Sequence, residues 1–325
     1  MKGLMNMQIP YTKVHGSRND FILIDEAGRN WTDEERVQLA LQVCRRDKGI
    51  GADGILFVSD SETADGKMRV FNADGSEASM CGNGLRCVAR YLIEKLEKEE
   101  LEVETMKATL SVKKEAEIFP GIPTFAVEIS PVSYKTSDLP INVNQDVIID
   151  EVISEIHPER KWSALAVPNP HLITVVEGNI IKSDEQKEIA EYLNGENPIC
   201  PDGVNVSYVV PLSEGNIFVK TYERGVGFTN ACGTAMSAST FITCQLGLNH
   251  WGNKINVYNP GGKVQCVATN SGEHPSIQLI GNATYEHQGT IHWNHEINFQ
   301  IHKVFKEEEQ AYQKLEENIG TILVF

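Results

Sequence analysis

Apolar side chains recur along this chain with two different spacings, and these spacings predict where its helices and strands lie. After Cys81, apolar residues recur every three or four positions over residues 85–96, which is the spacing of one helical face. After Cys232, small residues fill positions 233–238, and apolar residues follow them. Small residues on several sides of a helix allow close packing against its neighbours. We therefore predict that each cysteine stands at the start of a helix.

Two further helices are predicted from polar residues of the kind that cap helix ends. Thr32 with Glu35 has the form of a capping box, in which two side chains bond the first backbone N–H groups, and Ser183 with Gln186 has the same form. The second of these helices is expected to end at Gly195. Alternating or continuous apolar runs predict strands. These runs cover residues 21–24, 55–58, 101–113, 124–130, 172–176, 217–221, 254–258, 264–269 and 277–280.

The two cysteines lie in stretches of similar plan, at residues 72–84 and 222–235. Each stretch leaves an apolar run, crosses a Gly-rich turn, reaches a Cys-Gly step and enters a predicted helix. The first N–H groups of a helix lack internal partners and carry partial positive charge, so they bind anions such as a carboxylate. The same position lowers the pKa of a cysteine thiol. Gly82 and Gly233 would let a ligand approach the backbone closely.

Two such cysteines predict acid–base chemistry on one carbon atom. A carboxylate held between two helix starts would place a thiol on each face of the carbon that bears it. One thiolate would remove a proton from one face, the other thiol would return a proton to the opposite face, and aimed N–H groups would stabilise the enolate charge. The remaining cysteines are interpreted as small buried apolar residues. They are Cys44, Cys87, Cys200, Cys244 and Cys266.

Composition and charge narrow the possible classes of function. A chain of 325 residues exceeds a typical single core and predicts two domains. The net charge of −16 argues against nucleic acid and anionic membranes as partners. Seven cysteines without a CxxC pair or metal-ligand spacing argue against a disulfide framework and a metal site, and favour a reducing cytoplasm. Residues 1–10 lack the pattern of a signal peptide, and no apolar run reaches membrane-spanning length.

The sequence around the two cysteines resembles the active-site segments of the diaminopimelate epimerase family. Asn-Ala-Asp-Gly-Ser-Glu stands before the Cys-Gly-Asn-Gly of Cys81, and Glu-Arg-Gly-Val-Gly stands before the Ala-Cys-Gly-Thr of Cys232. The likeness runs from about Tyr11 to about Trp293. It implies an α+β fold of two similar domains, each a mainly antiparallel sheet wrapped around a central helix. It also implies a pyridoxal-independent amino-acid epimerase.

The resemblance and a linker-like segment at residues 131–140 together suggest how the chain divides. We expect an N-terminal domain at residues 1–133, to which a segment near 284–293 returns. We expect a C-terminal domain at residues 134–283. Residues 294–325 form an extension beyond the part that resembles the family, and no role is assigned to it.

The extension has its own pattern of polar and apolar residues. A polar helix candidate lies at residues 306–318, with acidic residues in its first turn, and an apolar end follows at residues 321–325. Acidic residues near the start of a helix are stabilised by its dipole. We expect the extension to form a surface helix or arm.

The resemblance implies interconversion of LL- and meso-diaminopimelate, in lysine and peptidoglycan precursor synthesis, without a cofactor or a metal. Cys81 and Cys232 would be the two bases, and His171 would support a catalytic thiol. The residues whose backbone N–H groups would hold the reacting carboxylate are Gly82, Asn83, Gly233 and Thr234. The residues whose side chains would bind the substrate, mostly at its distal end, are Asn19, Asn72, Asn169, Asn205, Glu223 and Arg224.

Three residues depart from the family's pattern. The family has a His-Gly-x-Gly-Asn-Asp-Phe segment, and Arg18 stands at its second glycine, directly before Asn19. We expect this departure to affect the conformation of the loop. Phe228 and Asn230 replace the family's more usual Glu or Ile and Leu, and we expect them to affect the dimer or the wall of the pocket.

Two other functions stay open at this point. Proline and hydroxyproline racemases share the implied fold, but their substrates have no second amino-acid end for the distal Asn residues, Glu223 and Arg224 to bind. A non-enzymatic amino-acid-binding protein or a thiol-redox protein could also use paired thiols, although a CxxC motif is missing. The preferred interpretation is an isomerase that acts on a small molecule, as a homodimer in the cytoplasm, with no nucleic-acid or membrane partner.

Overall fold

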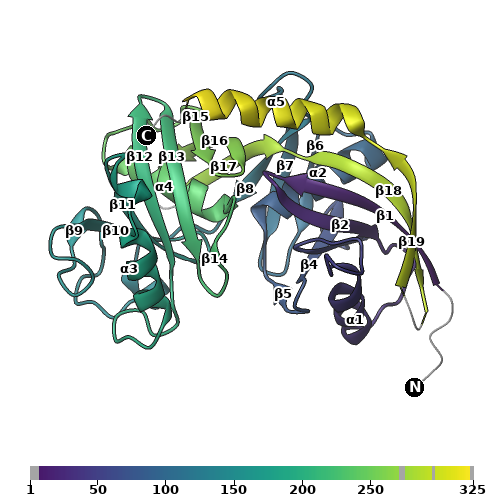
Figure 1. Ribbon diagram of the computed structural model, residues 1–325, viewed down its shortest axis with the longest axis horizontal. Coiled ribbons are helices and arrows are strands. Elements are labelled where there is room, and N and C mark those ends of the chain that lie inside the picture. The colour runs from purple at the N-terminus through teal and green to yellow at the C-terminus, as the bar shows by residue number, and fades with distance from the viewer. Residues whose placement is uncertain (1–6, 271–274, 295–296, 323–325) are drawn as a thin grey trace. The chain divides into compact units, whose positions relative to one another are not determined.

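The computed structural model describes residues 7–270, 275–294 and 297–322, and within them the chain forms two units (Figure 1). Unit 1 consists of Met1–Val127 and Gly281–Glu317, so it contains both early and late parts of the chain. Unit 2 consists of Glu128–Ile280 and Asn318–Phe325. Each unit has its own group of paired strands and its own buried helix, and each is described by itself.

Unit 1 is a mainly antiparallel sheet. Strand β1 pairs antiparallel with β18 and β2, β2 runs parallel to β3, β3 is antiparallel to β4, and β4 runs parallel to β6. Strands β7 and β8 continue from β6 as antiparallel neighbours, β5 pairs with β4, and β19 pairs with β18. The strands are β1 (Met7–Gly16), β2 (Asn19–Asp25), β3 (Gly54–Ser59), β4 (Gly66–Asn72), β5 (Glu77–Ala78), β6 (Glu100–Glu104), β7 (Thr109–Glu115), β8 (Thr124–Ile129), β18 (Thr284–Trp293) and β19 (Ile297–Val304), and the helices are α1 (Asp33–Val43), α2 (Gly82–Leu96) and α5 (Lys306–Ile322).

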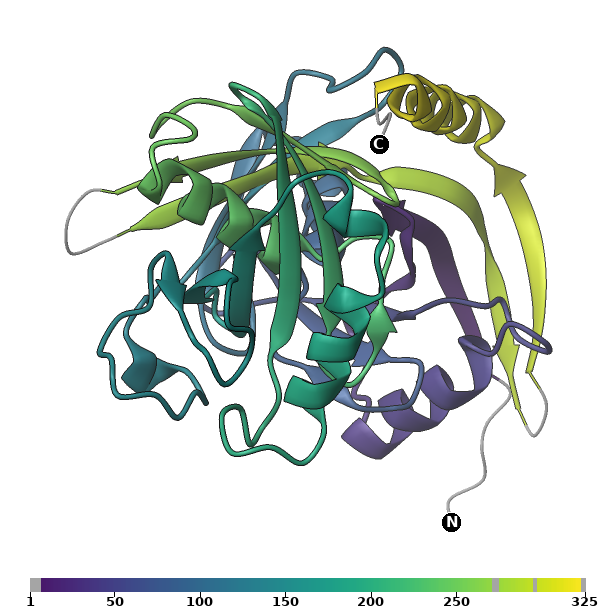
Figure 2. The same cartoon turned by 60° about the vertical axis from the view of Figure 1, so that its left-hand side comes forward.

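Unit 2 has a sheet of the same kind. Strand β10 is antiparallel to β9 and β11, β11 runs parallel to β12, β12 is antiparallel to β13, and β13 runs parallel to β15. Strands β16 and β17 continue antiparallel, β14 pairs with β13, and α3 packs on β12 and β13 (Figure 2). The elements are β9 (Glu151–Val152), β10 (Lys161–Ala166), β11 (Pro170–Val175), β12 (Asn205–Ser213), β13 (Asn216–Glu223), β14 (Gly227–Phe228), β15 (Ile255–Asn259), β16 (Gly262–Thr269), β17 (Ser276–Asn282), the helices α3 (Glu185–Asn194) and α4 (Gly233–Gln245), and the 3₁₀ turns η1 (Thr136–Asp138) and η2 (Ile180–Lys182).

The two units repeat the same order of connections. In each, an antiparallel hairpin leads through a helix to a parallel strand, then to an antiparallel strand and a two-residue strand. A central helix follows, α2 in unit 1 and α4 in unit 2. The strand after it pairs parallel to the earlier sheet, and two more strands then pair antiparallel in turn. The predicted α+β fold of two similar halves, each with a mainly antiparallel sheet, is therefore confirmed.

Helices α2 and α4 hold the central positions in their units. Helix α2 contacts β1, β2, β4, β6 and β7, and Leu85, Val88 and Leu92 are buried on it, as their spacing predicts. Helix α4 contacts β10, β11, β12, β13, β15 and β16, and every residue from Gly233 to Cys244 is buried. Small side chains make this burial possible, because they let strands approach the helix from several sides.

The local predictions have mixed outcomes. Thr32 caps α1, and its capping box with Glu35 is formed as expected. The box predicted at Ser183 is wrong: the N-cap of α3 is Asp184, and the amide of Gln186 donates instead to the carbonyl oxygens of Val206 and Lys220 in the neighbouring strands. The chain prefers this arrangement because it satisfies two buried backbone acceptors.

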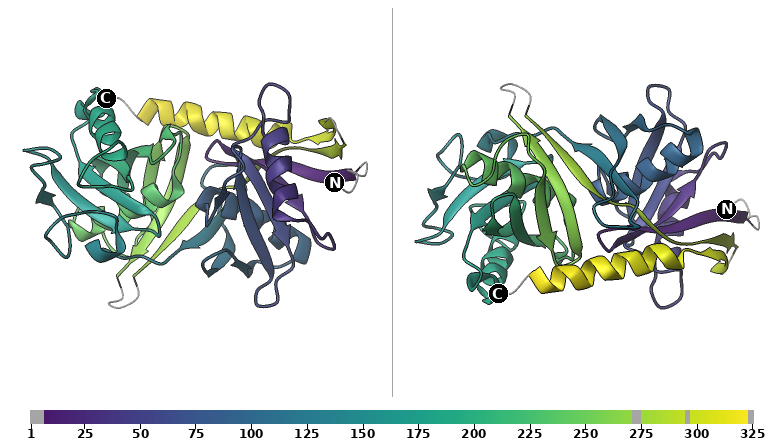
Figure 3. Two further views of the ribbon diagram at one scale, coloured as in Figure 1. Left: turned by 90° about the horizontal axis from the view of Figure 1, so that it is seen from below. Right: turned by 90° about the horizontal axis from the view of Figure 1, so that it is seen from above.

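Other expected elements differ in length. The strand predicted over residues 101–113 is two strands, β6 and β7, joined by a turn. Helix α5, the long helix in Figure 3, continues to Ile322, past the predicted end at 318. Tyr312 and Leu315 on it are buried. Of the apolar end predicted at 321–325, residues 323–325 lie outside the described residues. Each helix in the described ranges is too short or too polar to cross a membrane.

Candidate active site

Cys81 occupies the N-cap of α2, at the place where the backbone turns from extended to helical. Its φ and ψ are −143° and 111°, and its carbonyl oxygen accepts the first helical bond, from the N–H of Leu85 at 2.8 Å. The N–H of Gly84 points at the sulfur, with 3.4 Å between nitrogen and Sγ. Cys81 is half-buried. The predicted position is confirmed, and a helix N–H donor faces the thiol.

Asn19 connects the start of β2 to this cysteine. Its Oδ1 lies 3.6 Å from Sγ of Cys81 and 3.2 Å from Nδ2 of Asn83, while its own Nδ2 donates to Oδ2 of Asp53 at 2.7 Å. The carboxylate only accepts, so it fixes which way the Asn19 amide points. The Asn19 oxygen therefore faces the Cys81 thiol as an acceptor. The structure brings together the side chains of Asn19, Cys81 and Asn83.

Asn72 lies in a tight turn that precedes the cysteine. Its Nδ2 donates to the hydroxyl oxygen of Ser76 at 2.9 Å, and its backbone N–H donates to the carbonyl of Ser76 at 2.8 Å. Gly75 in this turn has a φ of 83°, which glycine adopts without strain. Among the described hydrogen bonds, the Asn72 side chain is engaged within its own turn and not with Asn19. Glu77, which follows this turn, pairs with Arg69 at 2.7 Å.

Cys232 takes the equivalent position in unit 2, at the N-cap of α4. Its φ and ψ are −116° and 108°, and its carbonyl oxygen accepts from the N–H of Met236 at 3.0 Å. Its Sγ lies 3.5 Å from the hydroxyl oxygen of Thr234. Cys232 is 7% exposed, and Gly233 and Thr234 are buried beside it. Thr234 therefore contacts the sulfur through its hydroxyl, whereas the sequence suggested only a backbone N–H directed at the substrate carboxylate.

His171 holds this hydroxyl from the other side. Its Nε2 lies 3.1 Å from the Thr234 hydroxyl oxygen and 3.0 Å from Oδ1 of Asn169. An amide oxygen only accepts, so Nε2 carries the proton. The ring is fully buried, and burial, together with the positive charge of Arg224, lowers the pKa of His171 to about 3. The histidine is therefore neutral at physiological pH, and it links Asn169 to Thr234.

The ionisation of Cys232 differs from the expectation. A helix start was expected to lower the pKa of the thiol, but burial raises the pKa of Cys232 well above its ordinary value, and the negative charge of Glu223 raises it further. The contacts with Thr234 and with the N–H of Ala235 act in the opposite direction. Desolvation dominates because a thiolate loses more hydration on burial than a few N–H dipoles restore. The raised pKa favours the protonated thiol form of Cys232.

Glu223, Arg224 and Asn205 meet where β12 begins and β13 ends. The backbone N–H of Arg224 donates to Oδ1 of Asn205 at 2.9 Å, and its Nη1 donates to the carbonyl of Asp202 at 3.1 Å. Glu223 accepts a hydrogen bond from the hydroxyl of Thr229. The Arg224 side chain is exposed, and Glu223 beside it is half-buried. An exposed guanidinium remains able to bind a carboxylate that arrives from solution.

A positioning residue was missed in the Gly-rich segment 49–54. Asp53 accepts from the Asn19 amide, and its Oδ2 also lies 3.2 Å from the backbone nitrogen of Asp20. Arg46 pairs with the carboxylates of both Asp20 and Asp53, with its Nη2 2.8 Å from Oδ1 of Asp20 and 2.7 Å from Oδ1 of Asp53. The sequence marked this segment only by its glycines, and a carboxylate between glycines has no distinctive spacing.

The three departures from the family pattern have defined places. Ser17 and Arg18 form a two-residue turn between β1 and β2, with φ values of 56° and 63°, and Asn19 begins β2 directly after it. Phe228 lies on β14 against the ring of Tyr222, and Asn230 accepts a backbone hydrogen bond from Gly261.

In the described part of the chain, no group of three or more His, Cys, Asp or Glu residues could hold a metal ion.

The family model for diaminopimelate epimerase matches residues 11–118 and 163–286 of this chain. The diaminopimelate epimerase of Listeria monocytogenes serovar 1/2a is 48% identical in a match over 322 residues that covers 97% of this chain and 98% of the relative. That match includes most of residues 294–325. The diaminopimelate epimerase of Ligilactobacillus salivarius is 51% identical over 282 residues, which are 84% of this chain and 86% of the relative.

Solved structures of low sequence identity share the fold. A Bacillus anthracis phenazine biosynthesis protein of the PhzF family aligns with a TM-score of 0.62 at 16% identity, over 87% of this chain and 99% of its own. This likeness concerns the fold alone. The family match covers most of the two repeated halves, and identity to relatives of nearly the same length approaches one half. The chain therefore belongs to the diaminopimelate epimerase family.

Proposed function

We propose that this protein is a cofactor-independent isomerase that interconverts LL- and meso-diaminopimelate. One observation carries the proposal: Cys81 and Cys232 are the N-caps of the two central helices, α2 and α4, at the same point of a repeated topology. Two equivalent thiols, each at a helix start, are suited to two opposite faces of one carbon. The curated relatives named above carry the same activity in their names.

In the proposed reaction, one cysteine acts as a thiolate and removes the α-proton. The C–H bond breaks, an S–H bond forms, and the electron pair moves onto the adjacent carboxylate as an enediolate. The other cysteine then donates its proton to the opposite face of the same carbon. The N–H groups of Gly82, Asn83 and Gly233 are proposed to stabilise the negative charge, because preorganised donors act most strongly where charge develops. The reverse reaction exchanges the roles of the two thiols.

The resting thiol state of Cys232 requires a base before it can act as a thiolate. Glu223 is placed for this role, because its carboxylate forms a hydrogen bond with the side chain of Cys232. A carboxylate within hydrogen-bond reach of an acid can accept its proton as a general base when a bound substrate changes the local charge. We propose that Glu223 takes the Cys232 proton when the substrate binds, and that the Thr234 hydroxyl stabilises the resulting thiolate.

Substrate binding is assigned to polar side chains near the two cysteines. We propose that Asn19 and Asn72 contribute from unit 1, and that Asn169, Asn205 and Arg224 contribute from unit 2. Arg224 is assigned to the distal carboxylate, since its exposed guanidinium presents a planar pair of donors. This distal carboxylate distinguishes diaminopimelate from proline, which has no second amino-acid end.

We also propose a cellular compartment and an oligomeric state for the protein. The seven cysteines are free in the structure, which suits a reducing compartment, and we propose the cytoplasm. We also propose a homodimer, as the resemblance to the family implies. The mechanism uses only side chains and backbone N–H groups of the chain, so neither a cofactor nor a metal is required for proton transfer.

Proton exchange at the α-carbon provides the test. LL-diaminopimelate and L-proline are incubated separately with the protein in deuterium oxide, and deuterium incorporation and epimer content are followed by NMR. We expect incorporation and epimerisation with diaminopimelate only. Cys81→Ala and Cys232→Ala should each abolish epimerisation, because one base cannot serve both faces, whereas Cys244→Ala, which changes a buried cysteine within α4, should retain it. Exchange with proline alone, or full turnover by Cys232→Ala, would contradict the proposal.

A further inference from the structure

The turn between β1 and β2 has a backbone conformation that its residues do not favour. Gly16 pairs with Asn19 across the hairpin, so the loop consists of Ser17 and Arg18 alone. Both have positive φ, 56° and 63°. Two-residue turns of this kind usually contain Asn and Gly, because other residues meet a steric penalty there. Contacts from elsewhere in unit 1 must therefore hold this turn.

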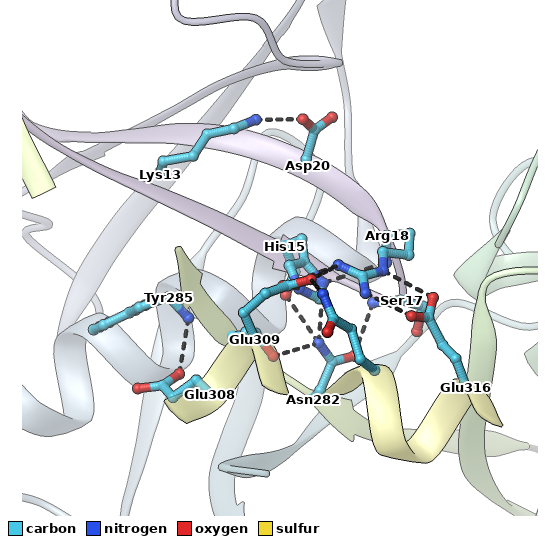
Figure 4. A network of polar contacts seen from close by, with 12 residues as sticks. Lys13, His15, Ser17, Arg18, Asp20, Asn282, Tyr285, Glu308, Glu309 and Glu316 are labelled. Carbon is cyan, nitrogen blue, oxygen red and sulfur yellow. Dashed lines mark hydrogen bonds and ion pairs between the residues drawn. The ribbon is translucent and has the colours of Figure 1, made fainter. Parts of the chain in front are cut away.

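Helix α5 supplies contacts on the Arg18 side (Figure 4). The guanidinium binds Glu316 through two donors, with Nε 2.8 Å from Oε1 and Nη2 2.5 Å from Oε2. Its Nη1 lies 2.9 Å and 3.0 Å from the two oxygens of Glu309. The guanidinium carbon also lies 4.7 Å from the centre of the Tyr312 ring. Contacts with His15 and Arg18 lower the pKa of Glu309 to about 2, so this carboxylate is charged at physiological pH.

The other side of the turn is held by residues close to α2. Asn282 accepts the backbone N–H of Ser17 at 2.8 Å. Arg86 on α2 donates to the hydroxyl of Ser17 at 3.2 Å and to the carbonyl of Asn282 at 3.0 Å. His15 packs edge-on against Tyr312, with 4.7 Å between ring centres. The turn is thus held between α2 and α5, and the ion pairs with Glu309 and Glu316 are the contacts that depend on an arginine at position 18.

We propose that Arg18, held by Glu309 and Glu316, is a positioning residue that sets the place of Asn19 and, through it, of the Cys81 thiol. Asn19 follows Arg18 directly, and its Oδ1 lies 3.6 Å from Sγ of Cys81. A shift of the turn would move the Asn19 oxygen away from the sulfur. Residues 294–325, the extension that contains α5, would then help to position the Cys81 thiol in unit 1. This inference rests on the proposed function, in which Cys81 is one of the two bases.

A general stabilising role for α5 must be separated from positioning. Helix α5 has other anchors: Glu308 binds Arg90 at 2.6 Å, and Tyr312 and Leu315 are buried. Removing the Arg18 contacts therefore leaves the helix attached. If α5 only stabilised unit 1, removing the contacts between α5 and Arg18 would make all buried groups of the unit more accessible to the same degree. If it positions Asn19, the change would be confined to the surroundings of Cys81.

The test measures alkylation of individual cysteines by iodoacetamide, followed by mass spectrometry of peptides. The variants are the double change Glu309→Gln with Glu316→Gln, and Arg18→Gly, which permits the positive φ but removes the guanidinium. Both should speed alkylation of Cys81, because the Asn19 oxygen no longer covers its sulfur. Cys87, fully buried on α2, reports general loosening and should react as in the wild type. Glu317→Gln, an exposed neighbour on α5, is the matched control and should change neither cysteine.

The Cys81 rate is expected to rise roughly two- to fivefold, which corresponds to the loss of partly exposed ion pairs. The kcat for diaminopimelate should fall in the same two variants and not in Glu317→Gln. An unchanged Cys81 rate, or equal increases at Cys81 and Cys87, would overturn the inference. Alkylation needs no turnover, so a selective rise at Cys81 in a protein without epimerase activity would support the positioning role and refute the proposed function instead.

Discussion

The imidazole Nε2 of His171 lies 3.1 Å from the hydroxyl oxygen of Thr234, and the same hydroxyl lies 3.5 Å from the sulfur of Cys232. His171 carries its proton on Nε2 and shares it between Oδ1 of Asn169 and the Thr234 oxygen. The Thr234 proton is then directed toward the sulfur. A neutral histidine in unit 2 therefore acts on the cysteine through a hydroxyl, and this orientation favours the thiolate form when it arises.

Replacing Thr234 by valine should slow the reaction. Valine keeps the shape and the backbone N–H but loses the hydroxyl that donates to Cys232. A hydrogen bond to a charged group is worth about 1.5–3 kcal/mol, so kcat should fall roughly 10- to 100-fold. Steady-state kinetics with LL-diaminopimelate measure this. Thr234→Ser keeps the hydroxyl and should lie close to the wild type; equal activity of the valine variant would show that the contact has no part in catalysis.

His171 should make the protein less stable as the pH falls below 6.5. The unfolded chain binds a proton at a histidine near pH 6.5, whereas burial lowers the pKa of folded His171 to about 3. Between these values the unfolded state binds more protons, so acid favours unfolding. From pH 6.5 to pH 5 this group should remove about 1.6 kcal/mol from the free energy of unfolding. Urea denaturation followed by circular dichroism across this range measures the change.

The contribution of His171 is obtained by difference, because other groups also titrate. His171→Gln should have a shallower dependence of unfolding free energy on pH than the wild type. His250→Gln changes an exposed histidine and serves as the control, with the wild-type dependence expected. Parallel curves for wild type and His171→Gln would mean that His171 is protonated in the folded protein, contrary to its burial.

Arg224 should affect substrate binding more than folding. Its side chain is exposed, so Arg224→Ala should leave thermal stability unchanged. If it binds the distal carboxylate, the alanine variant should lose roughly 10- to 100-fold in kcat/KM, chiefly through KM. Arg224→Lys keeps the charge without the planar fork and should fall in between. Lys187→Ala, which removes another exposed cation of unit 2, is the control; wild-type kinetics in both Arg224 variants would remove the argument for a distal carboxylate.

Local signals in the sequence predicted much of the fold and the centre of the candidate site. The helical spacing after Cys81 and the small residues after Cys232 placed both cysteines at helix starts, where the structure has them. The predicted cap at Thr32 is also formed, because a capping box depends on residues only three positions apart. The capping box predicted at Ser183 is absent because the Gln186 amide donates instead to two carbonyl oxygens of neighbouring strands, and no local sequence pattern reveals those contacts.

Longer-range contacts account for the rest. The partners of Arg18 lie 291 and 298 residues away along the chain, so nothing near the turn could indicate them. Asp53 lies 34 residues from Asn19, and its role depends on how β2 and β3 pair. The pKa of Cys232 could not be read from its helix position, because burial decided it and burial depends on the packing of the whole unit.

The division of unit 1 between the two ends of the chain has a consequence for biosynthesis. Strand β1 lies between β2 and β18, and unit 1 includes Gly281–Glu317. Proteins are made from the N-terminus, and domains tend to fold as soon as they emerge from the ribosome. Here the segment made first must wait for strands made last, while Glu128–Ile280 can fold in between. A nascent chain therefore carries β1 with one edge unpaired for most of its translation, and this half-finished sheet is where chaperones would be needed.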